Sequence, residues 1–392
     1  MISELFMPYV KGGVERRNWE IARRLARNHE VHVFTMRPPN TLAEEIIEGV
    51  SVHRTSCVDR LYDTKGRRRV RPALEFALGL FRRLGRERRR FDVVDCSAFP
   101  FFPCYPARSF SKRQGAPLIV TFHEVWGGYW REYFGNRVMA EAGRIVERSV
   151  ARLPDLIVSV SRLTSKRLVN DLGVDPKRIV HVPNGVDLSV FDARACIKDP
   201  DMVLFVGRLV PSKRVDLAVR ALARVREVYP RVKLHIVGDG PELSSLKSLV
   251  EGLGLSGNVS LLGTLPTYKE VADRMMRSRL FVMPSTREGF GMVVLESMAA
   301  STPVIVAKYE ANAALELVDH EHTGFVVEPD SPDAIAEAIM RLLGDEELYR
   351  RLALNGRVLA ESLTWDETAS AMERVYSSSF PTQRGLKMLR EE

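Results

Sequence analysis

Short apolar stretches alternate with amphipathic ones along the whole chain. In the first half, stretches rich in β-branched residues predict four buried strands, at Val31–Thr35, Asp92–Cys96, Leu118–Phe122 and Leu156–Ser159. The second half predicts six more, at Met202–Val206, Lys233–Val237, Val259–Leu262, Leu280–Met283, Pro303–Ala307 and Phe325–Val327. Helical patterns such as Glu15–Asn28 separate them. This alternation predicts an α/β fold with parallel, doubly wound sheets.

The pattern divides into two Rossmann-like domains, expected at residues 1–195 and 196–364. A chain of 392 residues is too long for one ordinary core, and turn signals lie at Asn184-Gly185 and Asp199-Pro200. Only a few residues from Met1 onward can form the first strand, which is unusually short. Ligands of such sheets bind beyond the carboxyl ends of the strands, so we expect the site in a cleft between the domains.

Composition narrows the class of protein. The four cysteines are scattered and form no CxxC pair, which argues against a zinc site or a disulfide framework. No apolar run approaches the roughly 18 residues needed to cross a bilayer, and no signal-peptide pattern is seen, so we expect a cytoplasmic protein, or one peripheral at the membrane. Residues 1–195 hold 34 Lys+Arg and 22 Asp+Glu, whereas 196–392 hold 24 and 28. The basic first half predicts an anionic partner.

The segment Pro284–Ala300 carries the strongest chemical signal. A buried strand ends at Pro284, and a helix is expected to begin near Gly291. Gly289 and Gly291 allow close approach of a ligand, and the helix start favours a phosphate. Glu288 and Glu296 can accept hydrogen bonds from hydroxyls on either side of it. The alternative is a plain turn with two solvated carboxylates.

Two further loops carry phosphate-binding features. Arg208 and Lys213 follow the strand that ends at Gly207, and two cations at that point suit a diphosphate. Gly12 and Gly13 lie between the first strand and the first helix, where they let the backbone approach a phosphate or a sugar. A solvated basic loop and an ordinary turn are the respective alternatives.

His123 follows the strand Leu118–Phe122 and is therefore expected at the edge of the cleft. A histidine there can hydrogen-bond a sugar hydroxyl or a reacting centre, although a lone histidine is more often structural. The other histidines show no spacing typical of metal ligands, and no Asp-x-Asp pair stands out. We therefore expect chemistry without a metal or another cofactor.

Several stretches together resemble the family-four retaining glycosyltransferases, which have the GT-B fold. They occur in the family's order over nearly the whole chain: GGVE at 12–15, TFHEVW at 121–126, VPNGVD at 182–187, VGRLVPSKRVDLAV at 206–219, IVGDGPE at 236–242, PSTREGFGMVVLESMA at 284–299, HTGFVVEPDSPDAIAEAI at 322–339 and TWDETASAMERVY at 364–376. Glu288 and Glu296 match the family's Glu-x7-Glu motif. The resemblance implies a nucleotide-diphosphate sugar as donor, either a UDP- or a GDP-sugar.

The resemblance also implies roles for individual residues. Glu296 would bind the donor ribose and Glu288 the hydroxyls of the transferred hexose-type sugar. Backbone groups of Gly289, Phe290 and Gly291 would face the sugar and the diphosphate. Arg208 and Lys213 would neutralise the diphosphate, Gly12 and Gly13 would close over it, and His123 would contact the sugar near its anomeric carbon. A last helix within residues 365–392 would cross back to the first domain.

The resemblance implies retention of configuration, with Arg208 and Lys213 stabilising the leaving group and the departing diphosphate accepting the acceptor's proton. One departure from the family is the segment 308–318, KYEANAALELV, which lacks the glycines often found there. The resemblance therefore does not extend to this part of the surface next to the sugar.

Residues 66–90 hold most of the excess positive charge. Leu74, Ala77, Leu78, Phe81 and Leu84 repeat at helical spacing beside arginines. Such a helix can lie on an anionic membrane surface, which suits a lipid-linked acceptor, although a glycan acceptor is also open. The favoured interpretation is an ordinary helix whose apolar stripe packs on the sheet.

Two rival functions remain at this point. One is a sugar-nucleotide epimerase of the same fold, which would need acid and base groups at the sugar. The other is a non-enzymatic nucleic-acid-binding protein driven by the basic half. Neither interleaved aromatics nor a groove-reading motif is visible, so we expect no nucleic acid among the partners.

Overall fold

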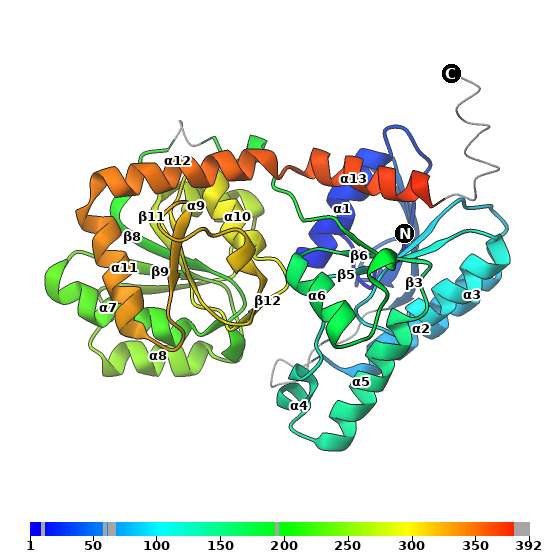
Figure 1. The fold of residues 1–392 in the computed structure, drawn as a ribbon, viewed down its shortest axis with the longest axis horizontal. Coiled ribbons are helices and arrows are strands. Elements are labelled where there is room, and N and C mark those ends of the chain that lie inside the picture. The colour runs from blue at the N-terminus through cyan, green and yellow to red at the C-terminus, as the bar shows by residue number, and fades with distance from the viewer. Residues whose placement is uncertain (9–11, 58–60, 62–67, 193–195, 380–392) are drawn as a thin grey trace. The chain divides into compact units, whose positions relative to one another are not determined.

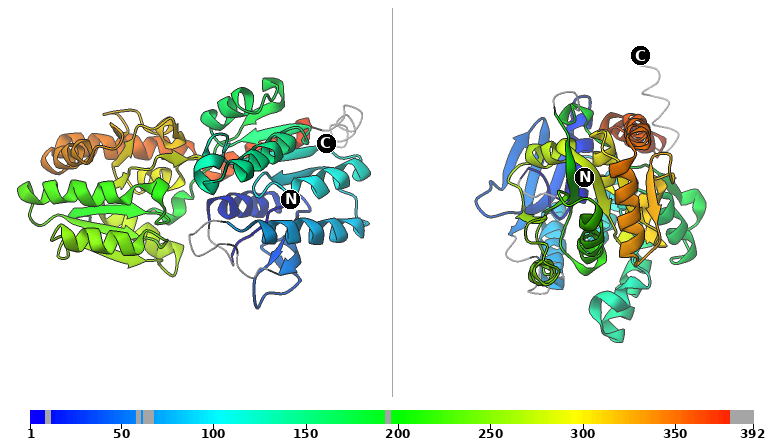
Figure 2. Two further views of the ribbon diagram at one scale, coloured as in Figure 1. Left: turned by 90° about the horizontal axis from the view of Figure 1, so that it is seen from below. Right: turned by 90° about the vertical axis from the view of Figure 1, so that its left-hand side faces the viewer.

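The computed structural model describes residues 1–8, 12–57, 61, 68–192 and 196–379. The chain forms two compact units (Figure 1). The first comprises Met1–Asn184 and the chain from Trp365 onward, and the second is Gly185–Thr364. In each unit, helices cover both faces of a central sheet (Figure 2). This arrangement confirms the predicted fold class of two Rossmann-like domains.

The first unit is built on a mainly parallel sheet. Its strands are β1 (His32–Arg37), β2 (Glu44–Ile47), β3 (Val50–Cys57), β4 (Val94–Ser97), β5 (Leu118–Phe122), β6 (Leu156–Ser159) and β7 (Ile179–His181). Its helices are α1 (Gly13–Leu25), α2 (Val70–Gly85), α3 (Cys104–Gln114), α4 (Tyr129–Phe134), α5 (Arg137–Ala151), α6 (Arg162–Asn170) and α13 (Trp365–Ser378). Only β2 runs antiparallel to its neighbour among the described strands of this unit, and it pairs with β3 at the sheet's edge.

The expected first strand is a very short segment at the centre of this sheet. Ile2 bridges in parallel to both Phe34 and Cys96, and thereby joins the group β1-β3-β2 to the group β4-β5-β6-β7. The amide of Ile2 donates to the carbonyl of Asp95 over 2.7 Å, and the amide of Ser97 donates to the carbonyl of Ile2 over 3.0 Å. The strand order therefore reverses at this segment, directly before the glycine loop.

The second unit is a six-stranded parallel sheet in the order β10-β9-β8-β11-β13-β15. These strands are β8 (Asp199–Val206), β9 (Lys233–Val237), β10 (Val259–Gly263), β11 (Ser278–Met283), β13 (Val304–Ala307) and β15 (Gly324–Val327). The helices are α7 (Val215–Val228), α8 (Leu243–Gly252), α9 (Tyr268–Arg277), α10 (Met292–Ala299), α11 (Pro332–Gly344) and α12 (Glu346–Ser362). The strand order reverses between β8 and β11, which marks the expected ligand position.

The boundary between the units lies at Asn184–Gly185, before the predicted residue 195. Residues after Gly185 make contacts within the second unit. The amide of Val186 donates to the carbonyl of Leu363, and Arg357 donates to the carbonyl of Phe191 over 3.0 Å. Turn signals occur on both sides of this segment, so the sequence does not show which unit it joins.

Helix α13 packs against α1 in the first unit (Figure 1). Met372 and Val375 are buried with Trp19 and Ile21. The Arg24 guanidinium pairs with Asp366 over 2.9 Å. The side chain of Arg17 is buried and donates to the Pro183 carbonyl and to Asn184 Oδ1, over 3.0 and 2.8 Å. The C-terminal helix is thus part of this unit's core.

Helix α2 differs from the favoured prediction. The stripe that packs in the core comprises Ala73, Phe76, Leu80 and Leu84. Leu74, Leu78 and Phe81, which were expected to pack on the sheet, are exposed. The helix therefore has a second apolar stripe, which faces away from the core. No helix in the described part of the chain is long and apolar enough to span a membrane.

Candidate functional site

The loops at the carboxyl ends of β8 and β11 form the candidate site of the second unit. β8 is followed by Arg208 and by a short 3-10 turn, Pro211–Lys213, and β11 is followed by the loop that contains Glu288. The amide of Thr286 donates to the carbonyl of Ser212 over 2.8 Å, which ties the two loops together. These loops flank the point where the strand order reverses.

Lys213 and Glu288 form an ion pair between the two loops. The Lys213 ammonium donates to Glu288 Oε1, and both side chains are largely buried. Sequence reasoning assigned these residues to a diphosphate and a sugar but did not foresee that they touch. The contact shows that the two proposed subsites are adjacent. Arg208 lies on the same loop as Lys213 and is exposed.

The Glu288 loop is braced by the segment that lacks the family's glycines. Two short strands, β12 (Arg287–Glu288) and β14 (Ala311–Asn312), pair in parallel, with Glu288 opposite Asn312. Asn312 is buried, and its side-chain Nδ2 donates to the carbonyl of Ala307 over 2.9 Å. Segment 308–318 therefore supports the backbone at Glu288 without any glycine.

Gly291 sets the start of α10. Its φ of 93° lies in the left-handed region, and a Cβ there would be 2.6 Å from the Cβ of Ala314. No side chain caps the helix, so the N–H groups of its first turn can bind an anion. Phe290, which directly precedes Gly291, is buried, whereas Gly289 is partly accessible to solvent. A phosphate can therefore approach the backbone at this point.

Glu296 lies one turn into α10 and is buried. The hydroxyl of Tyr268, the first residue of α9, donates to Glu296 Oε1 over 3.0 Å. The sequence did not predict this contact. The position of Tyr268 directly after the β10 loop is the signal that could have suggested it. Tyr268 holds the carboxylate in a fixed orientation.

The first unit carries its own candidate residues at the carboxyl edge of its sheet. Gly12 precedes α1, and Gly13 is the first residue of that helix. His123 follows β5, and its Nε2 lies 3.4 Å from Ser97 Oγ, at the end of β4. Asn18 donates to both Ser97 Oγ and Ser3 Oγ, over 3.0 and 2.8 Å. This polar chain fixes the ring of His123.

Burial lowers the pKa of His123 to about 3, and the nearby Arg17 guanidinium adds to the effect. The imidazole is therefore neutral near pH 7. A neutral ring can accept or donate one hydrogen bond to a sugar hydroxyl, but it is a poor proton donor there. This state suits a binding role better than general acid catalysis.

The pKa of His123 gives a testable pH dependence. Unfolded His123 titrates near pH 6.5, whereas the folded form stays neutral down to about pH 3. Acidification then protonates only the unfolded chain, so between pH 7 and 4.5 the group removes about 2–3 kcal/mol of stability. Urea unfolding of His123→Gln should show a correspondingly smaller loss over this range. An unchanged loss would contradict the assignment.

A second prediction concerns Gly291. Alanine there must adopt a left-handed φ and overlap Ala314, so Gly291→Ala should lower the free energy of unfolding by about 1–3 kcal/mol. Denaturant titration measures this loss. Gly252→Ala is the control, since its Cβ meets nothing within 4 Å. Equal stability of the two variants would show that the turn at Gly291 is not constrained.

Two doubly wound units in one chain define an α/β protein of the GT-B class. Residues 11–190 match the model described as Glycosyltransferase Family 4, and residues 191–359 match Glycosyl transferases group 1. A D-inositol 3-phosphate glycosyltransferase of Acidothermus cellulolyticus is 30% identical over 95% of this chain and 87% of its own length. The chain therefore belongs to glycosyltransferase family 4.

Other relatives match over a smaller share of their length. An exopolysaccharide phosphotransferase of Streptomyces coelicolor is 36% identical, but the match spans 50% of this chain and 20% of that protein. A D-inositol 3-phosphate glycosyltransferase of Kineococcus radiotolerans is 31% identical over 67% of this chain and 66% of its own length. This chain thus spans about a fifth to two thirds of these two relatives.

Solved structures share the fold. Sucrose-phosphate synthase from Thermosynechococcus elongatus superposes with a TM-score of 0.81 at 22% identity, over 96% of this chain and 97% of that one. HepE of Anabaena, crystallised with UDP and glucose, gives a TM-score of 0.74 at 19% identity, over 96% and 98%. At these identities the similarity establishes the fold alone.

Proposed function

We propose that this protein is a retaining glycosyltransferase that moves a hexose-type sugar from a UDP- or GDP-sugar to a lipid-linked or glycan acceptor. The observation that carries the proposal is the ion pair of Lys213 with Glu288, beside the uncapped start of α10. It puts a cation, a carboxylate and free N–H donors at the strand-order reversal of one Rossmann-like sheet. HepE, a structural neighbour, was crystallised with UDP-glucose.

The ion pair suggests how the donor would be received. A diphosphate carries more negative charge than one carboxylate and competes for the Lys213 ammonium. Glu288 would then be released to accept hydrogen bonds from the sugar's hydroxyls. In the absence of donor, the same pair keeps both groups compensated in a largely buried position. Arg208 would add a second cation to the diphosphate.

The remaining residues would fix the donor's two ends. Glu296, held by Tyr268, would accept from the ribose hydroxyls. Backbone groups of Gly289, Phe290 and Gly291 would face the sugar and the phosphates. From the first unit, Gly12 and Gly13 would contact the diphosphate, and the neutral His123 would bond a sugar hydroxyl. No metal is needed in this scheme, because Arg208, Lys213 and the helix start supply the positive charge.

The proposed reaction is a displacement at the anomeric carbon on the face from which the diphosphate departs. The bond from that carbon to the diphosphate oxygen breaks, and a bond to the acceptor's hydroxyl oxygen forms on the same face. The departing diphosphate takes the hydroxyl proton. Lys213 and Arg208 stabilise the charge that develops on the leaving oxygen, which is where catalytic benefit arises.

A donor panel tests the proposal directly. Purified protein is incubated with UDP-, GDP- and ADP-sugars in the presence of EDTA, and release of the nucleoside diphosphate is followed. We expect turnover of a donor with one base, and resistance to EDTA. Absence of release and of binding for every donor would refute the proposal. An epimerase would instead change the sugar while it remained attached to the nucleotide.

A further inference from the structure

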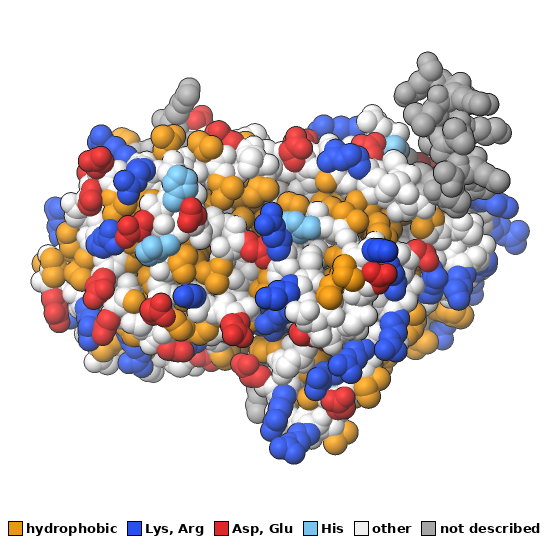
Figure 3. All heavy atoms as spheres, viewed as in Figure 1, with side chains coloured by type: hydrophobic (Ala, Val, Ile, Leu, Met, Phe, Trp, Pro, Cys, Tyr) orange, Lys and Arg blue, Asp and Glu red, His pale blue; other side chains and the backbone are white. Residues whose placement is uncertain are grey.

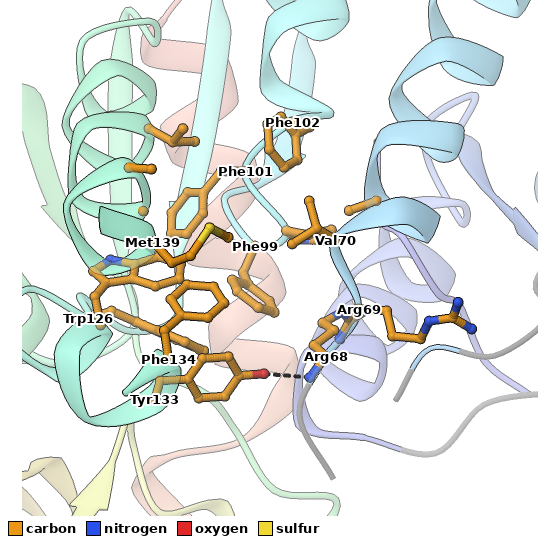
Figure 4. A pocket seen from close by; sticks show the side chains of 16 residues that line it. Arg68, Arg69, Val70, Phe99, Phe101, Phe102, Trp126, Tyr133, Phe134 and Met139 are labelled. Atoms are coloured by element: carbon orange, nitrogen blue, oxygen red, sulfur yellow. Dashed lines mark hydrogen bonds between the residues drawn. The ribbon is translucent and has the colours of Figure 1, made fainter. Parts of the chain in front are cut away.

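An apolar pocket lies in the first unit, and part of its wall comes from the loop that contains the candidate site residue His123. It encloses about 140 Å³, and aromatic rings form most of its wall. These include Phe99, Phe101, Trp126, Trp130, Tyr133 and Phe134 (Figure 4). Phe99 comes two residues after Ser97, and Trp126 three residues after His123. Part of the pocket wall therefore comes from the loops that follow the carboxyl ends of β4 and β5.

A buried carboxylate holds the pocket's tryptophans in place. Glu147 on α5 is fully buried and accepts from the amides of Trp126 and Gly127 over 2.7 and 3.1 Å. It also accepts from the indole Nε1 of Trp130 over 2.8 Å. Burial of a charge is costly unless it is fully hydrogen-bonded, as Glu147 is. These three bonds keep Trp126 and Trp130 at the wall.

The aromatic rings that form the pocket wall pack closely against one another and against α5. The rings of Phe99 and Trp126 stack with centroids 5.1 Å apart, and those of Trp130 and Phe134 with centroids 5.5 Å apart. Gly143 on α5 is needed for this packing, since a Cβ there would lie 2.7 Å from the Trp130 ring. The pocket is thus a preorganised site and not a packing defect.

Two exposed apolar stripes run from the rim of this pocket. On α2, Val70, Leu74, Leu78 and Phe81 are 40–60% exposed and follow one another at helical spacing. On α5, Val138 and Met139 are 77% and 45% exposed. Val70 and Met139 also line the pocket, so each stripe continues from its wall. Exposed apolar residues, here in a row on α2 and side by side at the start of α5, are typical of surfaces that contact lipid.

Positive charge surrounds the stripes. Residues 68–90 hold nine arginines and two glutamates. Figure 3 shows Lys and Arg side chains gathered on the first unit, between patches of hydrophobic side chains. Arg69 extends away from the rings in Figure 4, whereas the Arg68 guanidinium lies over the Phe99 ring, 5.3 Å from its centroid, and pairs with Glu4. The pocket wall is therefore mostly aromatic, with positive charge at one side of it. This division fits a ligand with an apolar chain and an anionic group.

We propose that the aromatic pocket seats the apolar chain of an anionic, lipid-linked acceptor, while the stripes on α2 and α5 rest on the lipid surface that supplies it. The inference rests on the proposed glycosyl transfer and names its acceptor class. A glycan without a lipid fits poorly, because the almost wholly apolar wall cannot compensate buried sugar hydroxyls. Glu147 is a positioning residue, since it acts through Trp126 and Trp130.

Farnesyl phosphate is a suitable probe, used below its micellar concentration and followed by tryptophan fluorescence. We expect saturable binding, at least tenfold weaker binding of farnesol, and none of inorganic phosphate. Ala142→Phe places a ring at the exposed rim of the pocket and should weaken binding at least tenfold. Its control is Glu141→Phe, on the neighbouring exposed position of α5, which should bind like the unaltered protein.

Nucleoside diphosphate binding, measured on the same samples, separates this inference from the proposed function. Binding of UDP or GDP by Ala142→Phe, with farnesyl phosphate binding lost, supports both. If the unaltered protein binds UDP or GDP but not farnesyl phosphate, or if Ala142→Phe binds the probe normally, the acceptor inference fails alone. If no nucleoside diphosphate binds, the proposed function fails.

A second variant tests the lipid surface independently of the pocket. Phe81→Glu adds a charge to the exposed stripe of α2 without touching the core. We expect it to lose binding to vesicles of phosphatidylcholine and phosphatidylglycerol (7:3) in flotation, while its binding of soluble farnesyl phosphate is unchanged. Vesicle binding equal to that of the unaltered protein would overturn the role of the stripes.

Discussion

Replacement of Lys213 by alanine is expected to lower the rate of sugar transfer by about 10²–10³. The ammonium is the cation that the structure places against Glu288, and removal of one preorganised charge donor from a developing oxyanion costs of this order. The loss should appear in kcat, since the charge on the leaving oxygen develops in the transition state. Steady-state kinetics with the preferred donor measures it.

The matched control for this variant is Lys233→Ala. Lys233 is exposed at the amino end of β9, opposite the edge where the candidate site lies. It should retain the full transfer rate. If Lys213→Ala were within a factor of about three of Lys233→Ala, the leaving-group role of Lys213 would be wrong, and the pair with Glu288 would be structural only.

Glutamine at position 288 is expected to lower kcat/KM by about 10- to 100-fold. A hydrogen bond to a charged group contributes about 1.5–3 kcal/mol, and the amide weakens the bonds to the sugar's hydroxyls. The nucleoside diphosphate alone should bind almost normally, because Glu288 is assigned to the sugar. Calorimetry with the diphosphate and kinetics with the sugar donor distinguish the two.

Glu296→Gln should instead weaken binding of the nucleoside diphosphate. Its carboxylate is assigned to the ribose, so affinity for donor and for nucleoside diphosphate should fall together, while kcat changes little. Glu227→Gln, at an exposed position of α7, is the control for both variants. If Glu288→Gln and Glu296→Gln had the same profile, the two carboxylates would not serve separate parts of the donor.

The sequence predicted the strands of both sheets well where they are buried on both faces. β5 and β6 have the expected bounds, because a short run of buried apolar and β-branched residues admits few alternatives. The edge pair β2 and β3 was missed. Its alternation of polar and apolar residues is weak, and His53 and Arg54 are buried through partners distant in sequence. Such partners are set by tertiary structure.

The sequence predicted which residues lie at the candidate site, but it did not predict the contacts between their side chains. The positions of Lys213 and Glu288 after their strands follow from the periodicity, and parallel strands bring their ends to one edge. Their ion pair, and the bond from Tyr268 to Glu296, depend on loop conformations such as the left-handed φ of Arg214 and Gly291. Residue types alone do not fix those angles.

The orientation of helix α2 on the sheet also could not be predicted from the sequence. Its apolar residues form two stripes, and the sequence does not say which of them faces the sheet. Phe76 and Leu80 fill the core beside Leu84, so Leu74 and Leu78 remain outside. The aromatic pocket was also missed, because its wall comes from loops after β4 and β5 together with α4 and α5. Only the folded chain brings these segments together.

The central claim is that the carboxyl edge of the second unit binds a nucleoside diphosphate. Unfolding of the protein with UDP, GDP or ADP tests it most directly, since a ligand at 100 times its dissociation constant adds about 2.7 kcal/mol of stability. We predict this stabilisation for one base, with at least tenfold weaker binding by Lys213→Ala and unchanged binding by Lys233→Ala. Stabilisation by none of the three, or equal binding by both variants, would contradict the account.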